Sequence, residues 1–152
     1  MTVESRVPSG GEMAAAIKVM FVCTGNSARS QMAEGFARHV GQGRVEAYSA
    51  GMEPSRLNPF AVAAMQEKGI DISHQQSKPL DEDLARRMDV VVTVCGNADK
   101  RCPILPPEVE RIHWPLEDPG AAKGSEAEIL AKFREIRDQI EARVLELVRS
   151  LK

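Results

Sequence analysis

Hydrophobic and polar positions follow two patterns along this chain, short apolar runs and helical spacing, which predict strands followed by helices. The first apolar run, Ile17–Cys23, is nearly continuous and predicts a strand that is buried on both faces. The next segment, from Ser30 to Val40, places Met32 and Phe36 at helical spacing, so we expect a helix with one apolar side. The folded part of the chain therefore begins with a strand, a short loop and a helix.

The same succession continues toward the C-terminus. We expect further strands at residues 44–50, 90–95 and, with a weaker pattern, 111–116. We expect further helices at residues 59–69, 81–87 and from 125 onward. Alternating strands and helices predict a single-domain α/β fold in which a parallel sheet carries helices on both faces. In such folds ligands bind beyond the carboxyl ends of the strands, so the residues that follow each strand are the candidates for chemistry.

Composition narrows the setting of this fold. The chain has 152 residues, enough for one domain, with 43% hydrophobic and 28% charged residues and a formal net charge of -2. This balance gives no reason to expect a nucleic-acid partner. No apolar run is long enough to cross a membrane, and the polar N-terminus lacks the apolar segment of a signal peptide. We therefore expect a cytoplasmic protein.

The N-terminal residues and the cysteines complete this outline. Residues 1–16 show no periodicity, so we expect a flexible tail ahead of a domain at 17–152, with Met13 as an alternative start to Met1. The three cysteines are an odd number and too few for a disulfide scaffold. In a reducing compartment such cysteines are inert, metal-bound or redox-active.

Cys23 and Arg29 lie at opposite ends of the loop between the first strand and the first helix. A loop that enters a helix N-terminus turns backbone N–H groups inward and forms an anion site. Gly25 permits a tight turn, while Asn26 and Ser27 can brace the loop with side-chain hydrogen bonds. The guanidinium of Arg29 adds a fork that matches a tetrahedral oxyanion, and this positive field favours the nucleophilic thiolate of Cys23. The pattern indicates a nucleophile beside a cradle for the anion it attacks, whereas the simpler alternative is a buried structural cysteine.

The eight residues from Cys23 to Ser30, CTGNSARS, resemble the anion loop of the low-molecular-weight tyrosine phosphatase superfamily. That superfamily contains phosphatases and thioredoxin-coupled arsenate reductases. The resemblance implies that Cys23 attacks the oxyanion and that Ser30 hydrogen-bonds the Cys23 thiolate. It implies an oxyanion cradle made by Thr24, Gly25, Asn26, Ser27, Ala28, Arg29 and Ser30. It also implies a four-stranded parallel sheet, in agreement with the alternation of strands and helices.

A second motif separates the two activities of that superfamily. Cys95 and Cys102 are seven positions apart in VTVCGNADKRCPILPP, after an apolar run and directly before Pro103. Taken alone, the pair is also compatible with half of a zinc site, for which His113 is the nearest histidine, or with two incidental thiols. The segment resembles the redox loop of thioredoxin-coupled arsenate reductases. Because the residues between the cysteines have little apolar anchorage, we expect a mobile loop here.

The resemblance to these reductases implies a relay of three thiols. Cys23 attacks arsenate, Cys95 attacks Cys23 and releases arsenite, and Cys102 then attacks Cys95. Thioredoxin or a similar dithiol protein reduces the remaining disulfide, so no bound cofactor is expected. Asp118 of the Asp-Pro-Gly turn is the expected general acid for the departing oxygen, with Glu117 as its neighbouring substitute. The alternative is that Asp118 only caps the turn.

Some members of the superfamily bind potassium beside the anion loop. The matching positions in this chain are Asn26, Glu34, Ser49 and Lys78. A lysine ammonium in place of a carboxylate would fill the role of the cation and repel the ion, so we expect no obligatory metal. The alternative is a lysine that only faces solvent.

Three functions are compatible with these motifs. The leading one is reduction of arsenate to arsenite for arsenic detoxification, with phosphate or sulfate as substrate analogues and a thioredoxin-like protein as partner. The second is a low-molecular-weight tyrosine phosphatase that hydrolyses phosphate monoesters with Cys23, Arg29 and Asp118, and weak activity of this kind could coexist with the first. The third is a non-catalytic oxyanion or redox sensor. Nothing in the sequence points beyond a monomer.

Overall fold

The computed structural model describes residues 16–151, so the expected tail at 1–16 lies, apart from Ala16, outside the described residues. The strands are β1 (Ile17–Cys23), β2 (Val45–Gly51), β3 (Val90–Thr93) and β4 (Glu110–His113). The helices are α1 (Arg29–Val40), α2 (Pro59–Gln66), α3 (Glu82–Arg86), α4 (Gly96–Arg101) and α5 (Glu126–Ser150), with a short 3-10 turn, η1 (Pro119–Ala121).

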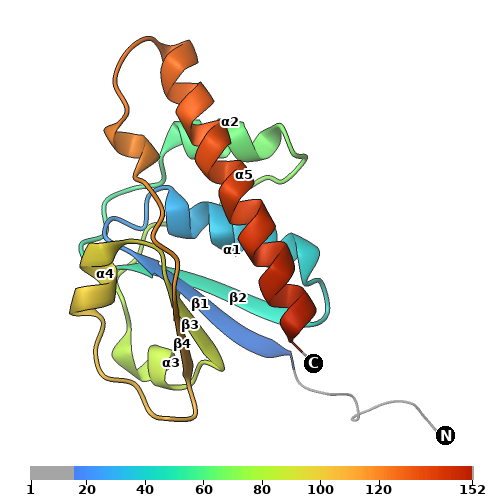
Figure 1. The fold of residues 1–152 in the computed structure, drawn as a ribbon, viewed down its shortest axis with the longest axis vertical. Coiled ribbons are helices and arrows are strands. Elements are labelled where there is room, and N and C mark those ends of the chain that lie inside the picture. Colours follow the sequence, from blue (N-terminus) through green and yellow to red (C-terminus); the bar gives the residue numbers. More distant parts are fainter. Residues whose placement is uncertain (1–15, 152) are drawn as a thin grey trace, which may run out of the picture.

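The four strands form one parallel sheet in the order β2-β1-β3-β4. The chain moves from β1 to β2 in one direction and then from β2 past β1 to β3 in the other. Because both crossovers are right-handed, α1 of the first and α3 of the second lie on opposite faces of the sheet, while α2, at the start of the second crossover, packs against α1 and α5. In Figure 1, α1, α2 and α5 lie together on one side of the sheet, and α3 and α4 lie on the other. The expected fold, a parallel sheet with helices on both faces, is confirmed.

The register of the sheet brings the ends of the strands to one edge. Cys23 of β1 pairs with Gly51 of β2, and the neighbouring Val22 pairs with Thr93 of β3. Thr93 pairs in turn with His113 of β4. The carboxyl ends of all four strands therefore meet at the edge where α1 and α4 begin.

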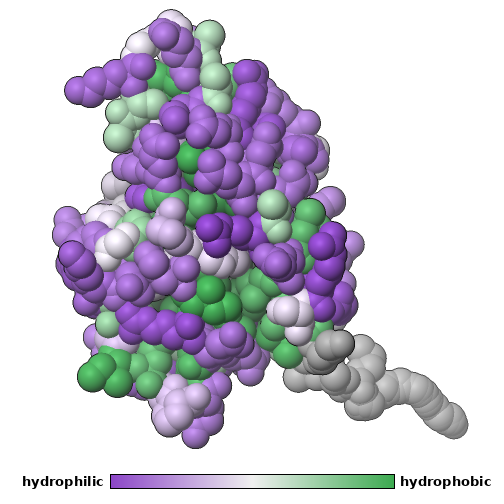
Figure 2. All heavy atoms as spheres, viewed as in Figure 1, coloured by the Kyte–Doolittle hydropathy of each residue, from purple (hydrophilic) through white to green (hydrophobic). Residues whose placement is uncertain are grey.

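The outer surface is mainly polar. Figure 2 shows a face dominated by hydrophilic residues and interrupted by smaller hydrophobic areas. One of the exposed apolar side chains is Ile104, which is 93% exposed and follows directly after Pro103. Across residues 16–151, no helix is long and apolar enough to cross a lipid bilayer.

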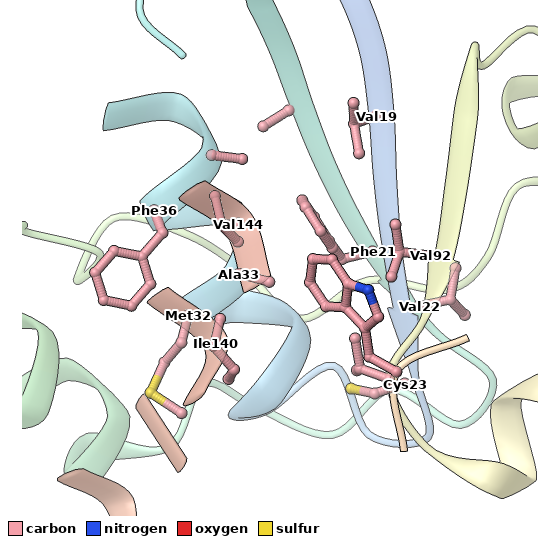
Figure 3. Close-up of a cluster of buried hydrophobic side chains, with 14 of the residues drawn as sticks. Val19, Phe21, Val22, Cys23, Met32, Ala33, Phe36, Val92, Ile140 and Val144 are labelled. Carbon is pink, nitrogen blue, oxygen red and sulfur yellow. The ribbon is translucent and has the colours of Figure 1, made fainter. Parts of the chain in front are cut away.

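The main core lies between the sheet and two of the helices. Met32 and Phe36 of α1 lie near Ile140 and Val144 of α5, and all four side chains are buried (Figure 3). Burying a side chain of this size stabilises the fold by about 1.5–3 kcal/mol. The same core covers β1, whose last residue, Cys23, lies at its border (Figure 3). The nucleophile candidate is thus fixed to the most deeply packed part of the molecule.

Two of the expected elements agree closely with the structure. The strand predicted at 17–23 has the same bounds as β1. The long helix predicted from 125 onward is α5, which begins with a capping box in which Ser125 and Glu128 exchange hydrogen bonds with each other's backbone. Strong periodicity and a clear start signal made these elements predictable.

Three other expectations are wrong in detail. The segment expected to be a loop, residues 96–99, lies in α4, where Ala98 is completely buried. The strand expected at 90–95 stops at Thr93, because Cys95 already accepts a hydrogen bond from the Ala98 amide as the N-cap of α4. The weak strand expected at 111–116 is β4, displaced toward the N-terminus.

An ion-pair network ties α5 to the end of α2. Arg134 and Arg137 of α5 both donate hydrogen bonds to the carboxylate of Glu67, at 2.7 Å and 2.8 Å for their nearest contacts. Arg137 also donates to the Ala64 carbonyl at 3.0 Å. The hydrogen bonds from Arg134 and Arg137 lower the pKa of Glu67 from 4.5 to about 2.

This network predicts a pH-dependent contribution to stability. Because the pKa of Glu67 is lower in the folded chain than in the unfolded chain, its contribution is complete above about pH 4.5 and is lost as the pH falls toward 2. The free energy of unfolding of the wild type should exceed that of Glu67→Gln at neutral pH, and the difference should shrink in acid. Urea unfolding of both proteins at several pH values measures it, and a difference that stays constant would contradict the prediction.

Candidate active site

The loop from Cys23 to Ser30 has an unusual backbone at its centre. Asn26 has a φ of 47°, in the left-handed region that asparagine tolerates better than most residues. This turn points the Asn26 amide at the sulfur of Cys23, to which it donates a hydrogen bond at 3.1 Å. Cys23 is only 2% exposed, so a backbone donor of this kind is a major partner for its thiolate.

A second hydrogen bond reaches the Cys23 sulfur from Ser30. The Asn26 side-chain amide donates to the Ser30 hydroxyl at 2.7 Å, and this hydroxyl lies 2.8 Å from the sulfur. Because the hydroxyl oxygen already accepts from Asn26, its own proton is free to point at Cys23. The role that the resemblance implied for Ser30 therefore has the required geometry.

Residues outside the loop hold Asn26 in place. Gln31 donates from its side chain to the Asn26 carbonyl at 2.9 Å and to the Asn26 side-chain oxygen at 3.1 Å. The backbone amide of Lys78 donates to the same side-chain oxygen at 3.0 Å. Asn26 and Gln31 are completely buried, so each of these polar groups needs its partner.

A cavity of about 300 Å³ opens in front of this loop. It is lined by Cys23, Thr24, Gly25, Ser27, Ala28, Arg29, Ser55, Asn58, Asp118 and Gly120. Two members of the expected cradle, Asn26 and Ser30, are absent from this lining and support Cys23 from behind. No side chain caps the N-terminus of α1, so the cavity lies at a helix end whose first amides lack a side-chain partner.

Arg29 and Asp118 both line the cavity and lie close to each other. Arg29 is fixed by a hydrogen bond to the Leu116 carbonyl at 3.0 Å, and its Nη2 lies 4.0 Å from the nearer oxygen of Asp118. Asp118 also caps η1 by accepting from the Gly120 amide at 2.9 Å. Its position is therefore compatible with a general acid that faces the cavity and with a residue that caps the turn. Glu117 contacts Lys132 at 3.4 Å and does not line the cavity, which makes it a poor substitute.

Cys95 lies beside the loop, and a hydroxyl and a side-chain amide are arranged at its sulfur as they are at Cys23. The Thr24 hydroxyl lies 3.3 Å from the Cys95 sulfur and accepts a hydrogen bond from the Asn97 side chain at 2.9 Å. Its own proton is therefore free for the sulfur, as for Ser30 and Cys23. Thr24 belongs to the loop that carries Cys23, so it links the first two thiols. No local pattern pointed to Asn97, because this contact joins residues far apart in the chain.

Cys102 closes the other end of α4. It is the C-cap residue, and its amide donates to the Ala98 carbonyl at 2.9 Å. All three cysteines are free and buried. Burial raises the pKa of the Cys102 thiol above its ordinary value, so this thiol is mostly protonated while α4 is wound.

Lys78 lies at the position where the resemblance placed a cation. Its ammonium is 3.4 Å from the Ser49 hydroxyl and 3.8 Å from the nearer oxygen of Glu34, and the Ser49 hydroxyl donates to that same carboxylate. The ammonium thus faces the buried carboxylate of Glu34 instead of only solvent. Among the described residues, no group of three or more His, Cys, Asp or Glu side chains is arranged to hold a metal ion.

Gly51, the last residue of β2, is a site residue that the sequence pattern did not reveal. A Cβ at this position would lie 2.8 Å from the Thr24 carbonyl oxygen and 2.9 Å from the Asn26 amide nitrogen. Those atoms belong to the backbone of the anion loop and cannot rotate away. The loop can approach β2 this closely only because residue 51 has no side chain.

The parallel sheet and the cysteine–arginine loop at its carboxyl edge define a class of cysteine-based oxyanion-binding proteins. Residues 18–152 match the family described as low molecular weight phosphotyrosine protein phosphatase, and the chain belongs to this family. The resemblance based on the loop is therefore confirmed.

Individual relatives share more than the family fold. The chain is similar to the arsenate reductase of Bacillus subtilis (strain 168), with 50% identity over 128 residues that cover 84% of this chain and 92% of the relative. It is similar to a solved structure of an arsenate reductase in the phosphate binding state, with 42% identity and a TM-score of 0.71 over 90% of this chain and 99% of that chain. A thioredoxin-dependent arsenate reductase from Corynebacterium glutamicum has 31% identity and a TM-score of 0.73, covering 93% of this chain and 65% of its own.

The close approach of Gly51 to the loop predicts a strong effect of one methyl group. Gly51→Ala should displace the loop amides and weaken the binding of inorganic phosphate or arsenate by about tenfold or more, because charge-assisted hydrogen bonds are lost. Gly96→Ala is the matched control, because a Cβ there meets no atom within 4 Å. Isothermal titration calorimetry compares the two variants, and unchanged binding by Gly51→Ala would refute the steric argument.

The position of Lys78 predicts that the activity of the wild type does not depend on potassium. Wild-type turnover should be equal in potassium chloride and choline chloride at the same ionic strength, because the Lys78 ammonium of the protein itself already faces Glu34. Lys78→Ala should lose activity and regain part of it as potassium is added. Lys68→Ala, which removes an ammonium from an ion pair remote from the loop, is the control. Activation of the wild type by potassium would show that Lys78 does not take this role.

Proposed function

We propose that this protein is an arsenate reductase that uses Cys23, Cys95 and Cys102 in sequence and is regenerated by a thioredoxin-like dithiol protein. The observation that carries the proposal is the placement of a second thiol at the rim of the anion loop, where Thr24 contacts Cys95. A hydrolase needs one nucleophile and water. A two-electron reduction needs a further thiol next to the first, and α4 supplies one at each of its ends.

The first step takes place in the cavity. The Cys23 thiolate attacks the arsenic atom of arsenate, and one oxygen leaves as water, which gives a sulfur–arsenic(V) ester. Arg29 and the loop amides hold the remaining oxygens, because a guanidinium fork and backbone donors match a tetrahedral oxyanion. Asp118 lines the same cavity as Cys23 and supplies the proton to the departing oxygen.

The second step transfers the electrons. The Cys95 thiolate attacks the Cys23 sulfur, so a Cys23–Cys95 disulfide forms and the electrons of the sulfur–arsenic bond remain on arsenic. Arsenite is the product. The Thr24 hydroxyl favours this step, because its proton can donate to the Cys95 sulfur as that sulfur attacks.

The third step requires α4 to unwind. Cys102 attacks the Cys95 sulfur, which frees Cys23 and leaves a Cys95–Cys102 disulfide. In a helix, residues seven positions apart have Cα atoms about 10 Å from each other, whereas a disulfide needs roughly 4.4–6.8 Å. The helix must therefore open at this point, which also exposes the new disulfide to an external dithiol with a reduction potential near that of thioredoxin, about -270 mV.

Single-turnover chemistry tests the proposal. With arsenate and no reductant, the wild type should release about one arsenite per chain and end with a Cys95–Cys102 disulfide. Cys102→Ser should also release about one arsenite but end with a trapped Cys23–Cys95 disulfide, whereas Cys95→Ser should release almost none. Arsenite measurement and mass spectrometry of the quenched protein distinguish these states.

The same variants test the phosphatase alternative. The cavity, Cys23, Arg29 and Asp118 could hydrolyse a phosphate monoester without the other two cysteines, so Cys95→Ser and Cys102→Ser should keep any such activity. Cys23→Ser should abolish both activities, because a serine hydroxyl is not ionised near neutral pH. Turnover of phenyl phosphate without thioredoxin-dependent arsenite formation would favour the phosphatase and overturn the reductase.

A further inference from the structure

The helix that separates Cys95 from Cys102 has little stability of its own. Helix α4 has six residues, GNADKR, among which Gly, Asn and Asp are weak helix formers. A helix of this length is unstable in isolation, and Ala98 is the buried residue that anchors it. Its wound state therefore depends on contacts with the rest of the molecule.

Arg111 of β4 makes contacts on both sides of Cys102. Its Nη2 donates to the backbone carbonyl of Asp99, in the second half of α4, and lies 3.3 Å from the Asp99 side chain. Its Nη1 donates to the carbonyl of Pro103, directly after Cys102, at 3.5 Å. One guanidinium thus holds the chain three residues before the resolving thiol and directly after it.

Asp99 is itself fixed by β3 and β4. The Thr93 hydroxyl donates to the Asp99 carboxylate at 3.0 Å, and the ring of His113 lies 2.9 Å from that hydroxyl and 3.9 Å from the carboxylate. The Thr93 hydrogen bond, together with Arg111, lowers the pKa of Asp99, so this carboxylate is charged at neutral pH. Arg111 therefore binds a rigid, ionised partner at the carboxyl edge of the sheet.

Three charged groups act on the Cys102 thiol. Burial raises its pKa, the guanidinium of Arg111 lowers it, and the carboxylates of Asp99 and Glu82 raise it. Of these groups, Arg111 alone favours the thiolate, and it comes from a different element than either carboxylate. The proposed reaction has so far assigned Arg111 no part.

We propose that Arg111 is a positioning residue of the third step, in which Cys102 attacks Cys95. Its guanidinium holds Cys102 at the end of α4 and keeps a positive charge beside the sulfur, so that the thiol can ionise when the helix opens. This inference rests on the proposed three-thiol reaction. It assigns Arg111 no part in arsenate binding or in the release of arsenite.

The first test isolates Cys102 as the only cysteine, in a Cys23→Ser, Cys95→Ser background. The rate of alkylation by iodoacetamide is measured against pH. Arg111→Met should move the midpoint of this profile to higher pH, whereas Asp99→Asn should move it to lower pH, and Arg111→Lys should restore most of the wild-type midpoint. Arg101→Met is the control, because Arg101 ends α4, its guanidinium pairs with Glu53 outside the helix, and its charge is not among those that shift the pKa of Cys102. The control should leave the midpoint unchanged.

The second test follows the reaction in the protein with all three cysteines. Arg111→Met should release the same single arsenite as the wild type, but its Cys23–Cys95 disulfide should persist about three- to tenfold longer, because fewer Cys102 thiols are ionised. A wild-type lifetime for that disulfide would overturn the proposal. A second result would also overturn the proposal. If Arg111→Met and Asp99→Asn were both alkylated faster at every pH, and neither midpoint moved, Arg111 would only clamp the helix. Alkylation needs no arsenate, so a wild type that releases no arsenite would refute the proposed function and leave the assay of Arg111 readable.

Discussion

The left-handed backbone of Asn26 is the constraint on which the rest of the site depends. It turns the Asn26 amide toward the Cys23 sulfur, and it places the Asn26 side chain against the Ser30 hydroxyl that serves the same sulfur. A left-handed non-glycine residue costs free energy and persists only where its surroundings hold it, and here Gln31 and the Lys78 amide do so. The absent side chain of Gly51 leaves room for this turn beside β2. The anion loop is thus held in shape by groups from three parts of the chain, whether or not an anion is bound.

The first two thiols receive the same kind of support from different residues. For Cys23 an asparagine amide donates to a serine hydroxyl, and for Cys95 the amide of Asn97 donates to the hydroxyl of Thr24. In each pair the hydroxyl accepts one hydrogen bond and keeps its own proton for sulfur. Neutral donors can stabilise a buried thiolate without placing a second full charge in the core. Cys102, which lacks such a pair, instead has Arg111 at its side.

Local patterns in the sequence sufficed for the strands, the long helix and the anion loop. Cys23 and Arg29 lie within one short motif, so their roles follow from the turn between a strand and a helix. Helix α4 was expected to be a loop because its own residues favour a loop, and its support comes from Thr24 and Arg111, distant in sequence. Gly51 had no signal of its own, because its importance arises from loop atoms brought near it only by the sheet register, whereas Lys78 was interpreted only through the family resemblance.

The weakness of α4 is a consequence of what the reaction requires of it. While wound, the helix keeps Cys95 beside the anion loop and Cys102 buried at its far end. The contacts that hold it are a few hydrogen bonds and ion pairs, each worth about 0.5–1.5 kcal/mol when partly exposed. Their sum is small enough for the helix to open without unfolding the sheet, because α4 itself contributes only Ala98 to the apolar core that holds β1, α1 and α5. A longer or more apolar helix between the two cysteines would be more stable, and it would keep Cys102 from ever reaching Cys95.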